Sequence, residues 1–209
     1  MQDRILRHAL SDRLIHWIIA VCTLVLLATA FLPILGIEFA WVAIHWWTGL
    51  ALIAAVVVHI VRSLVAKRLS RIWIGSRDLR DALRIAKLNL RLESGPLPKS
   101  GKYSVAQKLI HLAFAVVVLA ASASGAILMV KVDTPFWERN PYWLSDAAWG
   151  VVNVVHGLSA LLLITMVMLH VYFALRPEKL MFLRAMVLGW ITGREFDRMH
   201  DPDRWRVKE

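Results

Sequence analysis

Four long apolar segments constrain this 209-residue chain more than any other feature of its sequence. They run over residues 14–35, 39–66, 103–132 and 147–175. Each is long enough to cross a bilayer, since a hydrocarbon core of ~30 Å takes about 20 residues of helix. With 58% hydrophobic residues, the chain is too apolar for an ordinary soluble domain. The sequence therefore predicts an all-α integral membrane four-helix bundle, with residues 1–209 as a single transmembrane domain.

Basic residues concentrate in alternate connections between these segments. Residues 67–102 carry ten basic and three acidic side chains, and the tail 176–209 carries eight against six. The connection after the first segment offers only Glu38. Because basic loops remain cytoplasmic, both termini and residues 67–102 are predicted to face the cytoplasm. The net charge of +10 is thus a topology signal, and nucleic acid is not an expected partner.

The cytoplasmic connection also contains a short amphipathic pattern. Apolar and basic positions alternate there with helical spacing, which is typical of a helix lying on an anionic membrane surface. The apolar positions are Leu79, Leu83, Ala86 and Leu90, and the basic positions are Arg80, Arg84, Lys87 and Arg91. Membrane lipid is therefore an expected partner of this segment.

Six of the eight histidines fall inside the predicted spans, where a polar, titratable side chain is costly unless it has a partner or a function. His8 and His200 lie instead in polar flanks and are not expected to bind metal. The six are His16, His45, His59, His111, His156 and His170.

Two of these histidine pairs share one spacing, because His45 and His59, and likewise His156 and His170, are 14 residues apart. On a helix this corresponds to about 21 Å of rise and about 40° of rotation, so each pair occupies nearly one face. Two facing helices could then hold two stacked haems between them. Cys22 is the only cysteine, so any haem must be held by histidine and packing.

Chain direction sorts the histidines by depth in the membrane. Only His45 and His156 fall in the outer half, so an outer haem must use both. Four imidazoles compete for the inner haem, and spacing alone favours His59 with His170 over His16 with His170. In a reading of another class, the protein is a haem-free transporter or scaffold whose histidines relay protons.

Taken in order along the chain, several short motifs resemble the membrane cytochrome b (gamma) subunit of respiratory formate dehydrogenases. That family lies within the broader group of bacterial cytochrome b561 and nickel–iron hydrogenase cytochrome b subunits. The motifs are residues 12–17 (DRLIHW), His45 with Gly49, residues 102–108 (KYSVAQK), Gly125, His156 with His170 and Tyr172, and residues 200–205 (HDPDRW).

The resemblance implies two haem b groups, the outer on His45 and His156 and the inner on His16 and His170. It thereby favours His16 over His59, which remains the alternative inner ligand. A third haem on His59 and His111 is a further alternative.

The resemblance also implies a quinone site formed by Ser104, Gln107 and the surroundings of His170. The quinone would be ubiquinone or menaquinone. This chain has Ser104 and Ala106 where the family pattern tends to have Asn and Gly.

The expected function is electron transfer in a bacterial inner membrane, from an iron–sulfur subunit on the outer face to the quinone pool near the cytoplasmic face. Formate oxidation would belong to a separate, molybdopterin-containing subunit, because nothing in this chain supplies a molybdenum or tungsten site. A hydrogenase-linked or stand-alone cytochrome b561 is the alternative within the same class.

Overall fold

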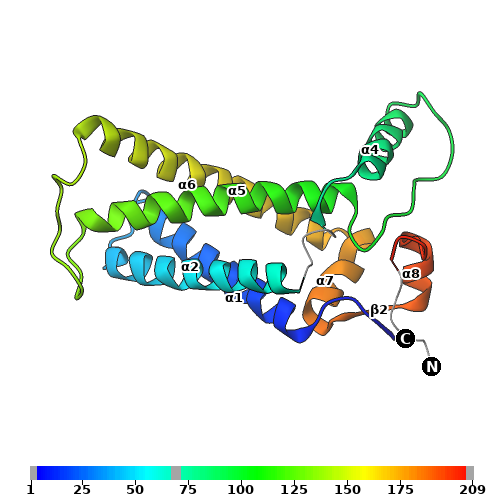
Figure 1. Cartoon of the computed structure of the whole chain (residues 1–209), viewed down its shortest axis with the longest axis horizontal. Helices are drawn as coiled ribbons and strands as arrows, with labels where there is room; N and C mark the ends of the chain where they lie inside the picture. The colour runs from blue at the N-terminus through cyan, green and yellow to red at the C-terminus, as the bar shows by residue number, and fades with distance from the viewer. Residues whose placement is uncertain (1–3, 67–71, 206–209) are drawn as a thin grey trace. The chain divides into compact units, whose positions relative to one another are not determined.

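A computed structural model describes residues 4–66 and 72–205 of the chain (Figure 1). Its four longest helices are α1 (Leu10–Phe31), α2 (Trp41–Val65), α5 (Val105–Leu128) and α6 (Asp146–Leu175). A 3₁₀ turn, η1 (Met129–Lys131), extends α5. All four helices are long and apolar enough to span a membrane. The predicted all-α membrane bundle is thus confirmed.

The first span ends four residues before the predicted boundary at position 35, because Pro33 follows it closely. A proline disfavours helical backbone at the residue before it, here Leu32, and supplies no N–H to the helix. The chain then turns through Gly36, whose φ of 83° is the left-handed conformation that glycine adopts at little cost. α2 begins five residues later, at Trp41.

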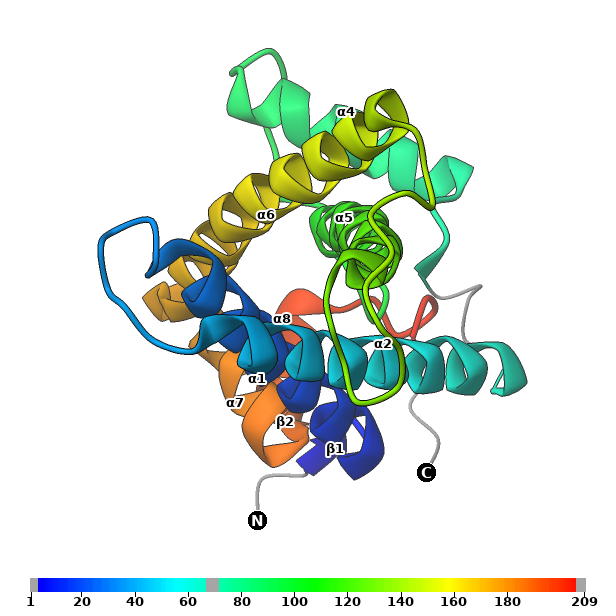
Figure 2. The ribbon, with the colours of Figure 1, turned by 90° about the vertical axis from the view of Figure 1, so that its left-hand side faces the viewer.

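The chain divides into two compact units, which we call the span unit (14–61 and 114–172) and the cap unit (1–13, 62–113 and 173–209). In the span unit, each of the four helices contributes one side chain to a buried core, namely Leu27, Leu52, Val118 and Leu163. Figure 2 shows these helices from the end that carries the α1–α2 and α5–α6 connections. Outward side chains such as Val21 and Leu161 are 57% and 53% exposed, as expected where lipid replaces water.

The cap unit joins the two ends of the chain. Strand β1 (Arg4–Leu6) pairs antiparallel with β2 (Trp190–Thr192), with Ile5 opposite Ile191. Helices α7 (Leu180–Leu188) and α8 (Gly193–Met199) flank β2, after the 3₁₀ turn η2 (Pro177–Lys179). The core of this unit consists of Met181, Ala185, Ile191 and Phe196. Helix α4 (Ser76–Asn89) belongs to the same unit.

Arg7 and His200 form a buried link within the cap unit, with only 2% and 1% of each residue exposed. The guanidinium Nη1 lies 2.7 Å from His200 Nε2, and Nη2 donates to the Lys102 carbonyl. The second ring nitrogen, Nδ1, lies 2.7 Å from the Gly101 carbonyl. A carbonyl only accepts, so Nδ1 carries the hydrogen and Nε2 accepts from Arg7. His200 is therefore neutral and buried, although the sequence places it in a polar flank.

This link predicts that the cap unit loses stability in mild acid. Burial, and then the charge of Arg7, lower the pKa of His200, while burial lowers the pKa of Arg7 only to about 10. Below about pH 6.5 the His200 imidazole therefore binds a proton in the unfolded chain but stays neutral in the folded chain. The contribution of neutral His200 to the free energy of unfolding is complete above that pH and is lost as the pH falls below it.

We expect the melting temperature of the purified protein to fall between about pH 7.5 and about pH 5.5, and to fall less in His200→Gln, which cannot titrate. An equal acid sensitivity in both proteins would show that another group is responsible.

Candidate cofactor site

Helix α6 places one histidine of each predicted pair in the span unit. His156 faces His45 of α2, with ring centroids 6.2 Å apart and ring planes at 74°. His170 faces His16 of α1, with centroids 6.4 Å apart and planes at 59°. The structure thus brings together both pairs that the family resemblance implied.

The two separations match the requirement of one iron ion between two imidazoles. An imidazole nitrogen binds a first-row metal at ~2.0 Å and lies ~1.1 Å from its ring centroid, so two imidazoles that held one iron ion between them would have centroids about 6.2 Å apart. Two rings joined directly by an N–H···N bond of ~2.9 Å would be only about 5.1 Å apart. Among the described residues, no three His, Cys, Asp or Glu side chains gather to hold a bare metal ion. The arrangement therefore fits haem.

Hydrogen bonds at the second ring nitrogen fix the tautomers of the first pair. His156 Nδ1 lies 3.2 Å from the Ala121 carbonyl and 3.1 Å from Ser124 Oγ. Since the carbonyl only accepts, Nδ1 carries the hydrogen and Nε2 has a lone pair for a metal. These partners come from α5.

His45 is held in the same way from α1. Its Nδ1 lies 2.8 Å from Thr29 Oγ1, and the Thr29 hydroxyl donates to the Val25 and Leu26 carbonyls of its own helix. The Thr29 oxygen therefore accepts from Nδ1–H, leaving Nε2 as the metal-binding nitrogen. Neither Thr29 nor Ser124 was predicted from the sequence, because the only signal of each is a hydroxyl within an apolar span.

We expect Thr29→Val to weaken haem binding at the His45–His156 pair by about 10- to 100-fold, because partners of the second ring nitrogen orient the ligand. Titration of haem into the apoprotein measures this affinity. Thr165→Val is the matched control, since Thr165 donates to the Leu161 carbonyl of its own helix and lies in the same unit. An unchanged affinity in Thr29→Val would show that this hydrogen bond does not position the ring.

A glycine allows α5 to approach the His156 ring. A Cβ at Gly125 would lie 3.1 Å from His156 Cε1, which is closer than side chains normally pack, and 3.5 Å from Nδ1, which is an ordinary contact. The absent side chain thus keeps room for the ring and preserves its bond to Ser124. Gly125 also belongs to the motifs that carry the family resemblance.

The alternative inner ligand, His59, lies on α2 in the span unit. His170 also meets Phe114 edge-on, with ring centroids 5.7 Å apart. His111, the other residue of the alternative third haem, belongs to the cap unit, whereas His59 belongs to the span unit.

Ser104 and Gln107 form a reciprocal cap at the start of α5. The Ser104 N–H donates to Gln107 Oε1 at 2.9 Å, and the Gln107 N–H donates to Ser104 Oγ at 3.3 Å. This capping box satisfies two backbone donors at a helix N-terminus. Ser104 and Gln107 belong to the cap unit, whereas His170 belongs to the span unit. The three residues of the predicted quinone site are therefore divided between the two units.

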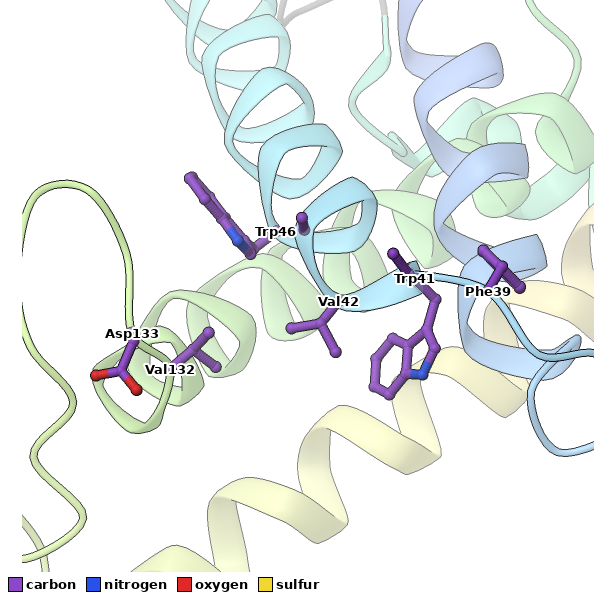
Figure 3. Close-up of a pocket in the computed structure, with 8 residues that line it drawn as sticks. Phe39, Trp41, Val42, Trp46, Val132 and Asp133 are labelled. Atoms are coloured by element: carbon purple, nitrogen blue, oxygen red, sulfur yellow. The ribbon is translucent and has the colours of Figure 1, made fainter.

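At the connection end of the span unit, a shallow pocket is lined by residues from the start of α2 and from the segment after η1 (Figure 3). Trp41 lines this pocket and also meets His45 edge-on, with centroids 6.2 Å apart. Exposed aromatic side chains extend the same end, including Trp47, Phe136 and Trp143. Besides Trp41, the pocket is lined by Phe39, Ala40, Val42, Ala43, Trp46, Val132 and Asp133.

Four membrane-length helices that bring two pairs of imidazoles together are typical of a membrane cytochrome of the b type. Comparison with known families agrees, since residues 7–189 match the prokaryotic cytochrome b561 family. The chain belongs to this family, and the family implies haem b as its cofactor.

Curated relatives match over nearly the whole chain. The cytochrome b556(fdo) subunit of formate dehydrogenase from Escherichia coli K12 is 26% identical, and the alignment covers 98% of this chain and 92% of the relative. The cytochrome b556 subunit of formate dehydrogenase from Haemophilus influenzae is 25% identical, and that alignment covers 99% of this chain and 84% of the relative. The family predicted from the sequence is thereby confirmed.

Proposed function

We propose that the chain is the di-haem membrane subunit of a formate dehydrogenase complex in a bacterial inner membrane. It connects an iron–sulfur subunit on the outer face to the quinone pool at the cytoplasmic face. The observation that carries the proposal is the two imidazole pairs that α6 forms with α2 and with α1, whose ring centroids are 6.2 and 6.4 Å apart. We assign the chain to a formate dehydrogenase complex because the relatives that match nearly all of it are formate dehydrogenase subunits.

In this proposal His45 and His156 hold the outer haem, and His16 and His170 hold the inner one. Bound haem supplies reversible one-electron chemistry. Thr29 and Ser124 keep Nε2 of the outer ligands available for iron. Because both α6 histidines lie on one helix 14 residues apart, they are spaced about 21 Å along the helix axis.

The iron–sulfur subunit is proposed to dock at the connection end of the span unit. Trp41 joins the pocket there to the His45 ring, and exposed aromatic rings are typical of interface anchors. Basic connections are expected on the cytoplasmic side, which supports a position outside the cytoplasm for this end. Formate oxidation occurs in a third, molybdopterin-containing subunit.

Quinone reduction is proposed near the entry to α5, at Ser104 and Gln107, with His170 contributing from α6. The quinone takes up its protons from the cytoplasm. Since electrons enter from the outer side, this uptake contributes to a proton-motive force. The quinone is ubiquinone or menaquinone, and the two are compared as electron acceptors.

Affinity purification through a tag on this chain tests the proposal. We expect an iron–sulfur and a molybdopterin subunit to copurify, and formate to reduce the b-type absorbance of the complex and then added ubiquinone or menaquinone. Copurification of a hydrogenase large subunit, with reduction by hydrogen instead, would support the hydrogenase-linked alternative. A purified chain without a reducible b-type spectrum would support the transporter or scaffold.

A further inference from the structure

We infer that helix α4 lies in the membrane surface and binds anionic lipid headgroups through two faces that the described residues of the cap unit leave uncovered. This inference concerns the cap unit alone and does not depend on the haem ligands. It rests on the three faces of α4 and on the way the helix is fastened to a span.

The first face of α4 packs against the cap unit. Its members follow one another at helical spacing and occupy about one third of the turn, since successive residues differ by ~100°. Asp78 is buried, and the others are half-buried. These residues are Asp78, Asp81, Ala82, Ile85 and Leu88.

The second face is apolar and uncovered. Leu79, Leu83 and Leu90 are 60%, 57% and 69% exposed, and Ala86 continues the same stripe. A helix that had used its apolar residues for the fold would not leave three leucines in one row open to solvent. The stripe therefore needs an apolar environment that the cap unit does not provide.

The third face is basic and borders the stripe. Arg80, Arg84, Lys87 and the following Arg91 are all exposed. Within the described residues, Arg84 is the member of this face that forms an ion pair, with Glu93 at 3.6 Å. A row of cations beside an apolar stripe is complementary to the phosphates and acyl chains of an anionic lipid surface.

The attachment of α4 places it at the membrane boundary. Lys108, in the first turn of α5, donates to Asp78 Oδ2 at 2.8 Å and to the Trp73 carbonyl at 3.0 Å. Burial alone would raise the pKa of Asp78, but the hydrogen bond and charge of Lys108 hold it below its ordinary value. The link thus persists at neutral pH. The first turn of α4 is therefore fixed to the end of a membrane-length helix.

The direction of α4 completes the argument. In Figure 2 the first turns of α5 are seen nearly end-on, whereas α4 is seen from its side, so α4 runs across α5. A helix that starts at the end of a span and runs across it extends along the bilayer surface. This is the position in which a stripe such as Leu79, Leu83 and Leu90 meets acyl chains while the basic face meets headgroups.

A fluorescent probe on the stripe tests this placement. In the full-length protein, Cys22→Ser removes the native thiol, and Leu83→Cys then carries an environment-sensitive dye. The protein is placed in nanodiscs of phosphatidylcholine alone or of an equimolar mixture with phosphatidylglycerol, with and without brominated acyl chains. We expect a blue-shifted, bromine-quenched probe in the mixed lipid and weaker quenching in phosphatidylcholine. A probe at the exposed Asp203→Cys position should stay unquenched.

Charge variants separate lipid binding from simple burial. Arg80→Gln with Lys87→Gln should lower the quenching in mixed lipid to the level found in phosphatidylcholine, while Arg194→Gln with Arg198→Gln, which removes the same charge from the α8 segment, should not. Equal melting temperatures confirm that both variants fold. A probe at position 83 that remains in water in both lipids would overturn the inference. So would equal quenching in the two lipids, because charge would then play no part.

Discussion

Replacing His156 by alanine is expected to halve the haem content of the purified chain, from about two b-type haems per polypeptide to about one. The substitution leaves His45 without the ring that faces it at 6.2 Å, and one imidazole does not retain a bis-histidine haem. The pyridine haemochrome assay measures the ratio directly. A redox titration of the same sample should show that one component has disappeared and the other is retained, because the His16–His170 pair is untouched.

His111→Ala is the matched control for this experiment, since it removes a histidine near the start of α5 that belongs to neither pair. It should keep both haems. Loss of a haem in this variant would favour the third haem that the extra histidines allow. Two haems in His156→Ala would contradict the proposed outer site.

His16→Ala and His59→Ala are expected to give opposite results. His16→Ala should lose the inner haem and all quinone reduction by the complex, whereas His59→Ala should keep both. The reason is geometric, since His16 faces His170 at a centroid distance of 6.4 Å, which fits one iron ion between them. Haem stoichiometry and the rate of formate-dependent quinone reduction are the two measurements.

The reverse result, with haem lost only from His59→Ala, would mean that α2 supplies both partners of the α6 histidines. The equal spacing of His45 and His59 had suggested that arrangement. A double variant, His16→Ala with His45→Ala, provides the reference for a haem-free protein. Its melting temperature would show whether the bundle folds without cofactor.

The fold and the His45–His156 pair were predicted from local sequence pattern, whereas the His16–His170 pair was predicted only from the family resemblance. Apolar length predicts the spans directly, and the position of each histidine within its span gives its depth in the membrane. Depth left only His45 and His156 for the outer pair. The helix ends were less predictable, as the turn at Pro33 shows.

Contacts between helices could not be predicted in the same way. Thr29 and Ser124 reach ring nitrogens on other helices, and the rotation that brings them there is not contained in any periodic pattern. The same holds for Arg7 and His200, which meet across almost the full length of the chain. A tail that appears polar in sequence therefore contains one of the most buried side chains of the cap unit.

Because α6 carries one histidine of each pair, the number of residues between them is restricted during evolution. Inserting one residue between His156 and His170 would rotate the second imidazole by ~100° relative to the first and move it by ~1.5 Å, so that one pair would lose its partner. Only changes close to whole turns keep both imidazoles in phase. Homologous chains are therefore free to vary in the connections, but insertions and deletions within this stretch of α6 should be confined to lengths that restore the phase.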